Sequence, residues 1–415
     1  MATFWFISAP LPGHLDWGGF LQTAQTLQAR GHQVRWLSEA AISPLVTAGG
    51  IPFETLPATG WLWPPPPAPD FAAMTHAAAL FSRYERALDT WLSEALIPPA
   101  VEAICAMAAR DGAPDVMVTD PFLTASALAA ERIGVPLAVA GWPAGQPLDE
   151  ERLVAVQSAL SRVSQQRVER LTAHFGLHGV NFSGGATPSV QSALLHLCYF
   201  SREWYQADPD FLPQTHFVGG LRSAAQGEVP AWLQAIPPDV PLALITLGTA
   251  FTGDLGFLSW AAQAAARLRM IPIVVIGTNP IPETEKSQFK ASLPAGTRLL
   301  NWVDFDQVFP RLKVIIHHGG MGTTHRAIVH GLPQIVVPHA ADQRGQARRV
   351  AQAKIGLNLN ALDIQRGQLL PAIRAVAEDP KVREAASALQ ASFAALGGAE
   401  RAAGLLIDLA EGQTQ

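Results

Sequence analysis

Residues 313–331 read KVIIHHGGMGTTHRAIVHG, and this stretch decides the fold. The apolar run KVII is typical of a buried strand, and HRAIVHG is typical of a helix that Gly331 closes. Between them, Gly319, Gly320 and Gly322 allow close backbone approach and left-handed torsions. A strand, a glycine-rich loop and a helix in this order indicate part of a parallel βαβ unit. The loop would lie at the carboxyl end of the strand, where doubly wound sheets bind their ligands.

The same alternation of strand and helix recurs in both halves of the 415-residue chain. In the first half the segments are TFWFISA (3–9), a loop PLPGHLDWGG (10–19), a helix FLQTAQTLQARG (20–31) and HQVRWLSE (32–39), then PDVMVTD (114–120). In the second half they are PLALITLGTAF (241–251), FLSWAAQAAARLRM (257–270), IPIVVIGTN (271–279) and PQIVVP (333–338). Such repetition predicts an α/β protein of two doubly wound domains.

The domain boundaries follow from composition. The segment from Val218 to Pro230 is rich in Pro, Gly and short polar residues and reads as a linker. We expect an N-terminal domain over residues 1–218, a linker over 219–240 and a C-terminal domain over 241–394. A helix over about 395–415 is expected to pack back on the N-terminal domain.

Composition excludes several classes of protein. A net charge of −5 and the lack of a basic run argue against a nucleic-acid binder. Cys105 and Cys198 match no ligand or redox spacing and suit buried thiols in a reducing compartment. No run approaches the roughly 20 apolar residues of a membrane helix, and the start lacks a basic leader. We therefore expect a cytoplasmic protein.

The glycine cluster predicts an anion site. Thr323 or Thr324 would cap the helix, and its first N–H groups would then point at a phosphate, with His317 as a further donor. A Walker loop would need Gly-Lys-Ser/Thr, and a dinucleotide fingerprint would need glycine where His325 stands. Zinc is disfavoured, because adjacent histidines on a strand face opposite sides. A tight packing turn remains the alternative.

The wider context carries a resemblance. Residues 301–350, NWVDFDQVFPRLKVIIHHGGMGTTHRAIVHGLPQIVVPHAADQRGQARRV, resemble the nucleotide-sugar signature of family 1 glycosyltransferases, closest to the bacterial antibiotic and sterol branch. The Gly-His loop, VTDPF and LGTAF extend the resemblance over most of the chain. It implies a GT-B fold, in which two Rossmann-like domains face a central cleft. The N-terminal domain would bind the acceptor and the C-terminal one the nucleotide sugar.

The resemblance also implies roles in the C-terminal domain. Trp302 would stack on the base, the Val303 backbone would contact the base edge, and His325 would meet the ribose. The diphosphate would be held by Thr249, His317, Gly320, Gly322 and Thr323. Asp342 and Gln343 would bind the sugar hydroxyls. From the residues alone, core packing for Trp302 and helix capping for Asp342 remain alternatives.

Two departures from the family pattern matter. Family members often carry Glu at the position of His325, which leaves UDP against dTDP open, because a neutral imidazole offers one donor and one acceptor. DFD (304–306) imitates an Asp-x-Asp metal motif, but it follows Trp302 in the base-binding segment. We expect capping of the next turn there, and no metal or other cofactor.

The reaction needs a base at the acceptor. His14 in PGHLD is a candidate, because histidine side chains ordinarily titrate near neutral pH, and Asp120 at the end of DVMVTD could orient it. The resemblance implies this same His–Asp pair, in a metal-independent transfer with inversion. Because Trp17 interrupts the family's GHxxP pattern, Asp16 remains an alternative base; turn formation is the plain alternative for both His14 and Asp120.

The acceptor pocket is expected in the N-terminal domain. Its candidate lining residues are Trp61, Trp63, Met74, Phe81 and Trp142, for which simple core packing is an equal alternative. Apolar pockets bind apolar ligands, so we expect a lipophilic alcohol, phenol, terpenoid or polyketide acceptor. The sequence thus predicts a hexose transfer from a UDP- or dTDP-sugar by a monomer or homodimer. An inactive helper of the same fold, a nucleotide-sugar epimerase and a cell-wall-type enzyme are the alternatives.

Overall fold

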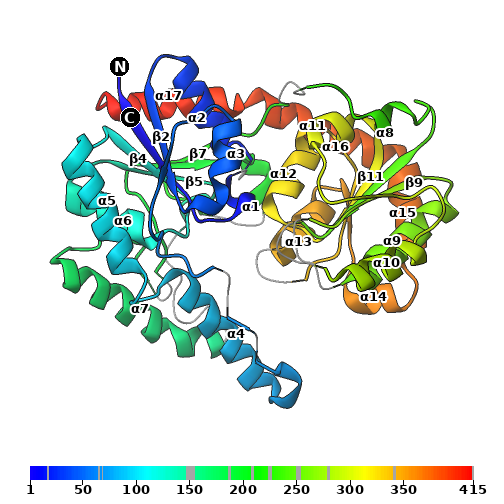
Figure 1. Cartoon of the computed structure of the whole chain (residues 1–415), viewed down its shortest axis with the longest axis horizontal. Helices are drawn as coiled ribbons and strands as arrows, with labels where there is room; N and C mark the ends of the chain where they lie inside the picture. Colours follow the sequence, from blue (N-terminus) through cyan, green and yellow to red (C-terminus); the bar gives the residue numbers. More distant parts are fainter. Residues whose placement is uncertain are drawn as a thin grey trace. The chain divides into compact units, whose positions relative to one another are not determined.

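The computed structural model describes residues 1–15, 18–63, 66–67, 69–145, 155–185, 188–206, 210–222, 227–248, 254–277, 281–339 and 343–413. Contacts divide the chain into two compact units (Figure 1). The first comprises Met1–Tyr199, Ala207–Val218 and Ala399–Gln415, and the second comprises Phe200–Gln206 and Gly219–Gly398.

This division differs in detail from the expected domains. Residues 219–240, expected as a linker, belong to the second unit, as does the short segment Phe200–Gln206. The C-terminal segment groups with the first unit, where Glu400 forms an ion pair with Arg30 at the end of a helix.

The first unit contains a seven-stranded sheet whose neighbouring strands all run parallel. Its strands are β1 (Thr3–Ile7), β2 (Gln33–Ser38), β3 (Phe53–Thr55), β4 (Val116–Thr119), β5 (Leu137–Ala140), β6 (Leu195–Cys198) and β7 (Thr215–Phe217). Their order is β3-β2-β1-β4-β5-β6-β7. The direction of winding therefore reverses between β1 and β4, which is the topological switch point where such sheets bind ligands.

Alternate residues of β1 enter cores on opposite faces of this sheet. Trp5 and Ile7 join a buried cluster formed with two helices. Phe6, between them, stacks on Trp36 at 5.5 Å and makes a tilted contact with Phe20 at 5.3 Å, both measured between ring centroids. A strand buried on both faces reads as a continuous apolar run, which is why TFWFISA was recognisable in the sequence.

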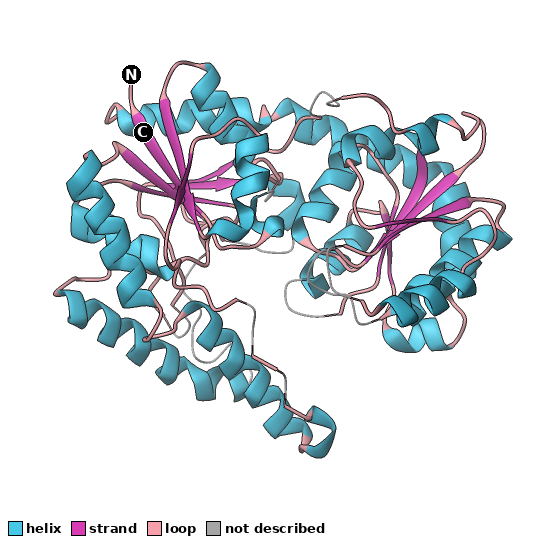
Figure 2. Ribbon diagram, in the orientation of Figure 1, coloured by secondary structure: helices cyan, strands magenta, loops and turns pink. Residues whose placement is uncertain are grey.

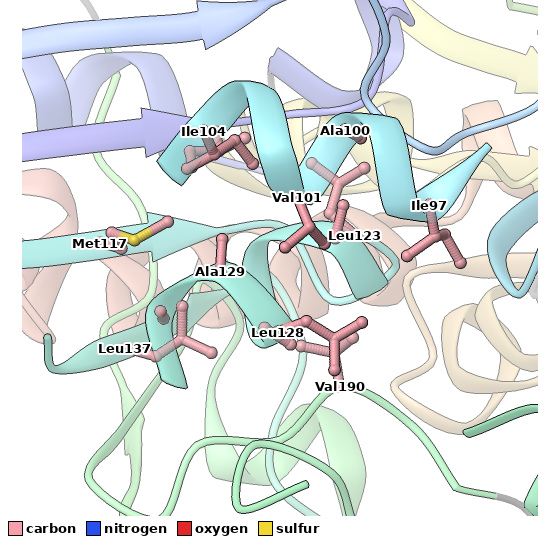
Figure 3. Packing of buried hydrophobic residues seen from close by; sticks show 14 of the residues in the cluster. Ile97, Ala100, Val101, Ile104, Met117, Leu123, Leu128, Ala129, Leu137 and Val190 are labelled. Carbon is pink, nitrogen blue, oxygen red and sulfur yellow. The ribbon is translucent and has the colours of Figure 1, made fainter. Parts of the chain in front are cut away.

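Figure 3 shows the first of these cores at close range. Ile97, Val101 and Ile104 project from α5 (Ile97–Asp111) toward α6 (Thr124–Ile133), with Met117 of β4 beside them. At about 25 cal/mol per Å² of apolar surface removed from water, such packing is the main stabilising contribution to the unit.

The second unit repeats the plan with six parallel strands. They are β8 (Leu242–Thr246), β9 (Ile271–Val275), β10 (Arg298–Leu300), β11 (Leu312–His317), β12 (Gln334–Val336) and β13 (Gly356–Asn358). The order is β10-β9-β8-β11-β12-β13, so the switch point lies between β8 and β11.

Both faces of this second sheet are also covered. Ala243 and Ile245 of β8 lie in one buried cluster, and Leu242 and Leu244 lie in another. Since successive side chains of a strand face opposite sides, helices must cover both sides, as Figure 2 shows. The expected pair of doubly wound α/β units is confirmed.

The remaining helices lie between these strands or follow the last of them. In the first unit they are α1 (Pro12–Leu15), α2 (Phe20–Ala29), α3 (Ser43–Ala48), α4 (His76–Trp91) and α7 (Ala155–Phe175), with α17 (Gly398–Ala410) at the carboxyl end of the chain. In the second unit they are α8 (Ala231–Gln234), α9 (Leu255–Arg267), α10 (Glu283–Ser292), α11 (Phe305–Val308), α12 (Met321–Val329), α13 (Gln343–Gln352), α14 (Ala361–Gln365), α15 (Leu369–Glu378) and α16 (Pro380–Ala395).

Two smaller expectations can be compared with the structure. PLPGHLDWGG is not wholly a loop, because Pro12–Leu15 forms the short helix α1, which Pro12 begins. Cys198 is buried, as expected, whereas Cys105 is only partly buried, and the two do not form a disulfide. None of the helices in the described part of the chain combines the length and apolar character needed to cross a bilayer.

Candidate active site

In the first unit, two candidate residues flank the switch point. His14 lies in α1, which directly follows β1, and Asp120 directly follows β4. Because β1 and β4 are hydrogen-bonded neighbours, both positions lie at the same edge of the sheet. The structure describes only the backbone of His14, and Asp16 lies outside the described residues.

The Asp120 carboxylate is fully buried and held by the backbone. Its Oδ2 accepts a hydrogen bond from the Ala9 N–H and its Oδ1 accepts one from the Phe122 N–H, each at 2.9 Å. These bonds tie the end of β4 to the loop after β1. Asp120 therefore does form a turn, as the plain alternative held, and it also fixes the segment that leads to His14.

Three aromatic rings gather next to Asp120. Phe122 makes edge contacts with Trp61 at 5.8 Å and with Trp142 at 5.1 Å between centroids. Phe122 was not among the predicted pocket residues, although it belongs to the quoted TDPF motif. The structure thus brings together two of the five predicted acceptor residues through a third ring.

The other three predicted acceptor residues are exposed at the surface. Trp63, Met74 and Phe81 are exposed, by 41%, 37% and 37% respectively. Exposure on this scale argues against the alternative that they pack the core. It leaves them available to a ligand.

In the second unit, the glycine cluster lies at the switch point. α12 begins at Met321 directly after β11, with Gly320 as its N-cap residue. The expected side-chain cap is wrong: Thr323 and Thr324 lie inside the helix, and the Thr324 hydroxyl donates back to the Gly320 carbonyl. The first-turn amides, including those of Gly322 and Thr323, therefore have no acceptor within the helix.

His317 is fully buried at the end of β11. Its Nδ1 accepts a hydrogen bond from the Gly319 N–H at 3.1 Å, so its proton is on Nε2, which donates to Gln334 Oε1 at 2.9 Å. Burial lowers the pKa of His317 to about 4, against the opposing effect of the Gln334 bond. With both nitrogens engaged, the expected direct donation to a phosphate is not available in this geometry. What the ring does is hold the turn at Gly319.

His318 is the histidine that our sequence reasoning passed over. Its ring lies between two loops: a Cβ on Gly248 would come within 2.6 Å of its Cε1, and a Cβ on Gly320 within 2.4 Å of its Nε2. Burial, followed by the charges of His317 and His339, lowers the pKa of His318 to about 3. A neutral imidazole therefore separates the loops after β8 and β11, and both glycines are required for it to fit.

His325 does not lie where a ribose contact would need it. The side chain is 1% exposed, and its ring contacts the rings of Phe200 and Phe393 at 5.4 and 5.8 Å. A Cβ on Gly220 would lie 2.5 Å from the ring. The expected ribose contact is wrong for this geometry, because the phase of α12 directs residue 325 into the interior while Thr323 stays partly exposed.

Trp302 lies on the same edge of the second sheet, just after β10. It is 68% exposed, so the core-packing alternative for it is wrong, whereas the Val303 side chain is buried beneath it in the core. A large exposed aromatic ring anchored by a buried neighbour is physically suited to stack on a base.

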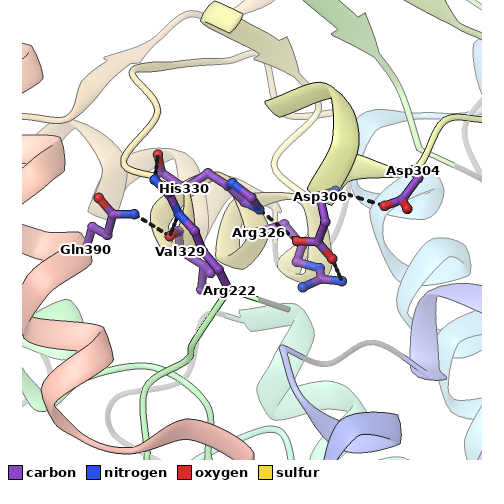
Figure 4. A network of polar contacts seen from close by, with 7 residues as sticks. All are labelled: Arg222, Asp304, Asp306, Arg326, Val329, His330 and Gln390. Atoms are coloured by element: carbon purple, nitrogen blue, oxygen red, sulfur yellow. Dashed lines mark hydrogen bonds and ion pairs between the residues drawn. The ribbon is translucent and has the colours of Figure 1, made fainter. Parts of the chain in front are cut away.

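The DFD segment has structural partners for both carboxylates (Figure 4). Asp304 caps α11 by accepting from the Asp306 N–H at 2.9 Å, as expected. Asp306 contacts His330 at 2.8 Å and Arg326 at 3.1 Å. Burial would raise the pKa of Asp306, but the hydrogen bonds and charges of His330 and Arg326 outweigh it and lower that pKa.

Gln343, one of the two residues expected to bind the sugar, begins α13. Gln343 is 3% exposed, and its Oε1 accepts a hydrogen bond from the His339 N–H at 2.8 Å, which closes the loop after β12. Asp342 and Thr249 lie outside the described residues. The structure therefore places the predicted nucleotide residues Trp302, Gly320, Gly322 and Thr323, and the predicted sugar residue Gln343, along one edge of this sheet.

Two doubly wound parallel units, each with candidate residues at its switch point, define the GT-B class of protein. Comparisons with known proteins agree. Residues 273–409 match the family model described as the C-terminal domain of erythromycin biosynthesis protein CIII-like proteins. 4'-Demethylrebeccamycin synthase of Lentzea aerocolonigenes is 24% identical over 418 residues, covering 94% of each chain. Erythronolide mycarosyltransferase of Saccharopolyspora erythraea is 26% identical, covering 90% of each.

A solved structure shows the same fold. Spinosyn rhamnosyltransferase SpnG complexed with thymidine diphosphate has a TM-score of 0.72 at 19% identity, covering 99% of this chain and 100% of the other. The chain is a glycosyltransferase with the GT-B fold, and it is similar to glycosyltransferases of bacterial antibiotic biosynthesis.

Proposed function

We propose that this enzyme moves a hexose from a UDP- or dTDP-sugar to a hydroxyl of a lipophilic small molecule, with inversion at the anomeric carbon. The observation that carries the proposal is the start of α12 at the switch point of the second unit. The N–H groups of the first turn, which have no acceptor within the helix, and the positive end of a helix dipole suit a pyrophosphate. A related glycosyltransferase, SpnG, was solved with thymidine diphosphate.

The leaving nucleotide needs its charge stabilised. We assign this to the first-turn amides of α12, including Gly322 and Thr323, with Trp302 stacked on the base and Gln343 next to the sugar. His317 acts indirectly, since its acceptor bond from Gly319 shapes the turn before the helix. The assignment uses protein groups throughout, so we propose a reaction that needs neither a metal ion nor another cofactor.

The acceptor hydroxyl needs a base, which we assign to His14 with Asp120 as its orienting partner. The proton passes from the hydroxyl to His14 as the oxygen bonds to the anomeric carbon, and the bond from that carbon to the β-phosphate oxygen breaks. Attack from the face opposite the leaving group inverts the carbon. The buried Asp120, held by two backbone N–H groups, keeps the loop after β1 in place.

The acceptor class follows from the aromatic residues of the first unit. Phe122, Trp61 and Trp142 form an apolar group beside Asp120. Apolar surroundings favour a lipophilic alcohol, phenol, terpenoid or polyketide. The names of two relatives, 4'-demethylrebeccamycin synthase and erythronolide mycarosyltransferase, agree with a natural-product acceptor. A cytoplasmic location belongs to the same proposal.

The test is release of UDP or dTDP with a panel of such acceptors, with and without EDTA. We expect His14→Ala to lower kcat by 100-fold or more, within the usual contribution of general-base catalysis. EDTA should change nothing, and His174→Ala, on the exposed side of α7, is the matched control. Full activity of His14→Ala together with loss in Asp16→Asn would move the base to Asp16. Nucleotide binding without any turnover would favour an inactive helper.

A further inference from the structure

A second polar pair lies on the nucleotide-binding edge of the second sheet. His339 follows β12, and Asp254 precedes α9, the helix after β8. Their side chains approach to 3.6 Å between His339 Nε2 and Asp254 Oδ2. β8 and β12 lie on either side of β11, so the pair spans the switch point beside the start of α12.

The orientation of the His339 ring is determined by its neighbours. Nδ1 lies 2.8 Å from the Val337 carbonyl oxygen and must donate its proton there. The ring edge packs against Phe257 at 5.8 Å between centroids. In the neutral ring, Nε2 is consequently an unprotonated acceptor that faces Asp254. The side chain is 23% exposed, unlike those of His317 and His318, which are buried.

Asp254 also has one oxygen committed. Its Oδ1 accepts a hydrogen bond from the Phe257 N–H at 2.9 Å and so caps α9. Oδ2 faces His339, in a side chain that is 53% exposed. With the ring neutral, neither Nε2 nor Oδ2 carries a proton, and their separation of 3.6 Å exceeds a hydrogen bond. They are arranged to receive a donor from a ligand.

We propose that His339 and Asp254 form a sugar subsite that accepts hydrogen bonds from a hydroxyl or ammonium group of the transferred hexose. The inference rests on the proposed function and names a specificity determinant within it. A phosphate does not suit this pair, because the Asp254 carboxylate would repel it. The subsite adjoins the predicted sugar residue Gln343, whose Oε1 is held by the His339 N–H.

The experiment compares two dissociation constants in the full-length enzyme without acceptor: that of the intact nucleotide sugar and that of the bare nucleoside diphosphate. Asp254→Asn keeps a residue that caps helices well and removes the charge. His339→Asn keeps a donor for the Val337 carbonyl and removes Nε2, whereas His339→Gln keeps a polar group near the position of Nε2. Asp379→Asn is the control, since Asp379 caps α16 in the same way.

We expect Asp254→Asn and His339→Asn to weaken nucleotide-sugar binding about 10-fold, the usual effect of a lost hydrogen bond to a charged or well-placed group. The bare diphosphate should bind within about 2-fold of its original constant. His339→Gln should restore part of the loss, and Asp379→Asn should change neither constant. Equal weakening of both ligands, or unchanged sugar-nucleotide binding in both variants, overturns the subsite.

Two donor arms identify the group that is recognised. An amino-sugar nucleotide should lose more affinity in Asp254→Asn than a neutral hexose nucleotide does if the group is an ammonium, and no more if it is a hydroxyl. If Asp254→Asn changes the affinity for neither nucleotide sugar, the proposal is contradicted. Failure of the proposed function is distinguishable, because it would show as absence of nucleotide release by the unmodified enzyme.

Discussion

Side-chain exposure separates two residues that the sequence assigned to the same nucleotide site. Trp302 is largely exposed on a short segment after an edge strand, whereas His325 is buried among aromatic rings. A sequence motif gives the order of residue types but not the rotational phase of a helix relative to its neighbours. Asp306 illustrates the same limit, since its partners His330 and Arg326 lie far along the chain.

Replacing Trp302 by Ala should weaken binding of UDP or dTDP by about 10-fold, because stacking of a base on an aromatic ring contributes roughly 1–3 kcal/mol. The melting temperature should hardly change, since so exposed a ring contributes little to the core. Calorimetric titration with each nucleotide measures the first effect and thermal unfolding the second. Trp302→Phe, which keeps a flat ring, should retain most of the affinity. A marked loss of stability with unaltered nucleotide binding would contradict the stacking role and indicate that Trp302 packs against the protein instead.

At the scale of elements, His318 explains why the loops after β8 and β11 need glycine at particular positions. The ring contacts the places where side chains of residues 248 and 320 would begin. The torsions of Gly248 include a φ of 76°, but Gly320 has φ −60° and ψ 143°, which any residue adopts. Glycine at 320 is therefore required by space alone. The sequence shows the glycines, but it does not show that the His318 ring occupies the space beside them.

Gly320→Ala tests that spacing. Its Cβ would lie 2.4 Å from His318 Nε2, so the ring or the loop must move. We expect a loss of about 1–3 kcal/mol in unfolding free energy, as for overpacked cores, and weaker nucleoside diphosphate binding. His318→Ala in the same chain should recover part of both losses, which a double-mutant cycle would measure as a coupling energy. Gly184→Ala, where a Cβ meets nothing within 4 Å, is the control. Simple additivity of the two substitutions would show that the ring does not set the spacing.

At the scale of the whole chain, most of the fold could be predicted from the sequence, because its strands are buried on both faces and appear as apolar runs followed by helical periodicity. The parallel order and both switch points follow from that alternation. Contacts between segments that are far apart in the sequence could not be predicted in this way. Phe200–Gln206 joins the second unit although it lies within the first half of the chain, and there Trp204 Nε1 donates to Gln346 at 3.0 Å. Partners 142 residues apart leave no local pattern.

Buried neutral histidines in both units predict a shared dependence of stability on pH. Burial lowers the pKa of His196 to about 4, and the pKa values of His317 and His318 to about 4 and about 3. The unfolded chain binds protons at these positions below about pH 6.5, whereas the folded chain does not. The contribution of these histidines to the free energy of unfolding is therefore fully present above about pH 6.5. It falls as the pH drops toward 4, by up to about 3 kcal/mol for a group such as His196.

Urea unfolding at pH 7.5, 6.0 and 5.0 would measure this slope, and His196→Gln should make it shallower in the first unit. The variant should also be less stable at pH 7.5, because His196 accepts from the Ser192 N–H and bonds the Trp142 carbonyl oxygen. His174→Ala, at an exposed position, should leave the slope unchanged. Asp306 acts in a separate and more acid window, since its lowered pKa contributes stability that is lost only below about pH 4. An unfolding free energy that stayed constant from pH 7.5 to 5.0 would contradict this prediction, because these imidazoles would then have the same pKa in the folded and the unfolded chain.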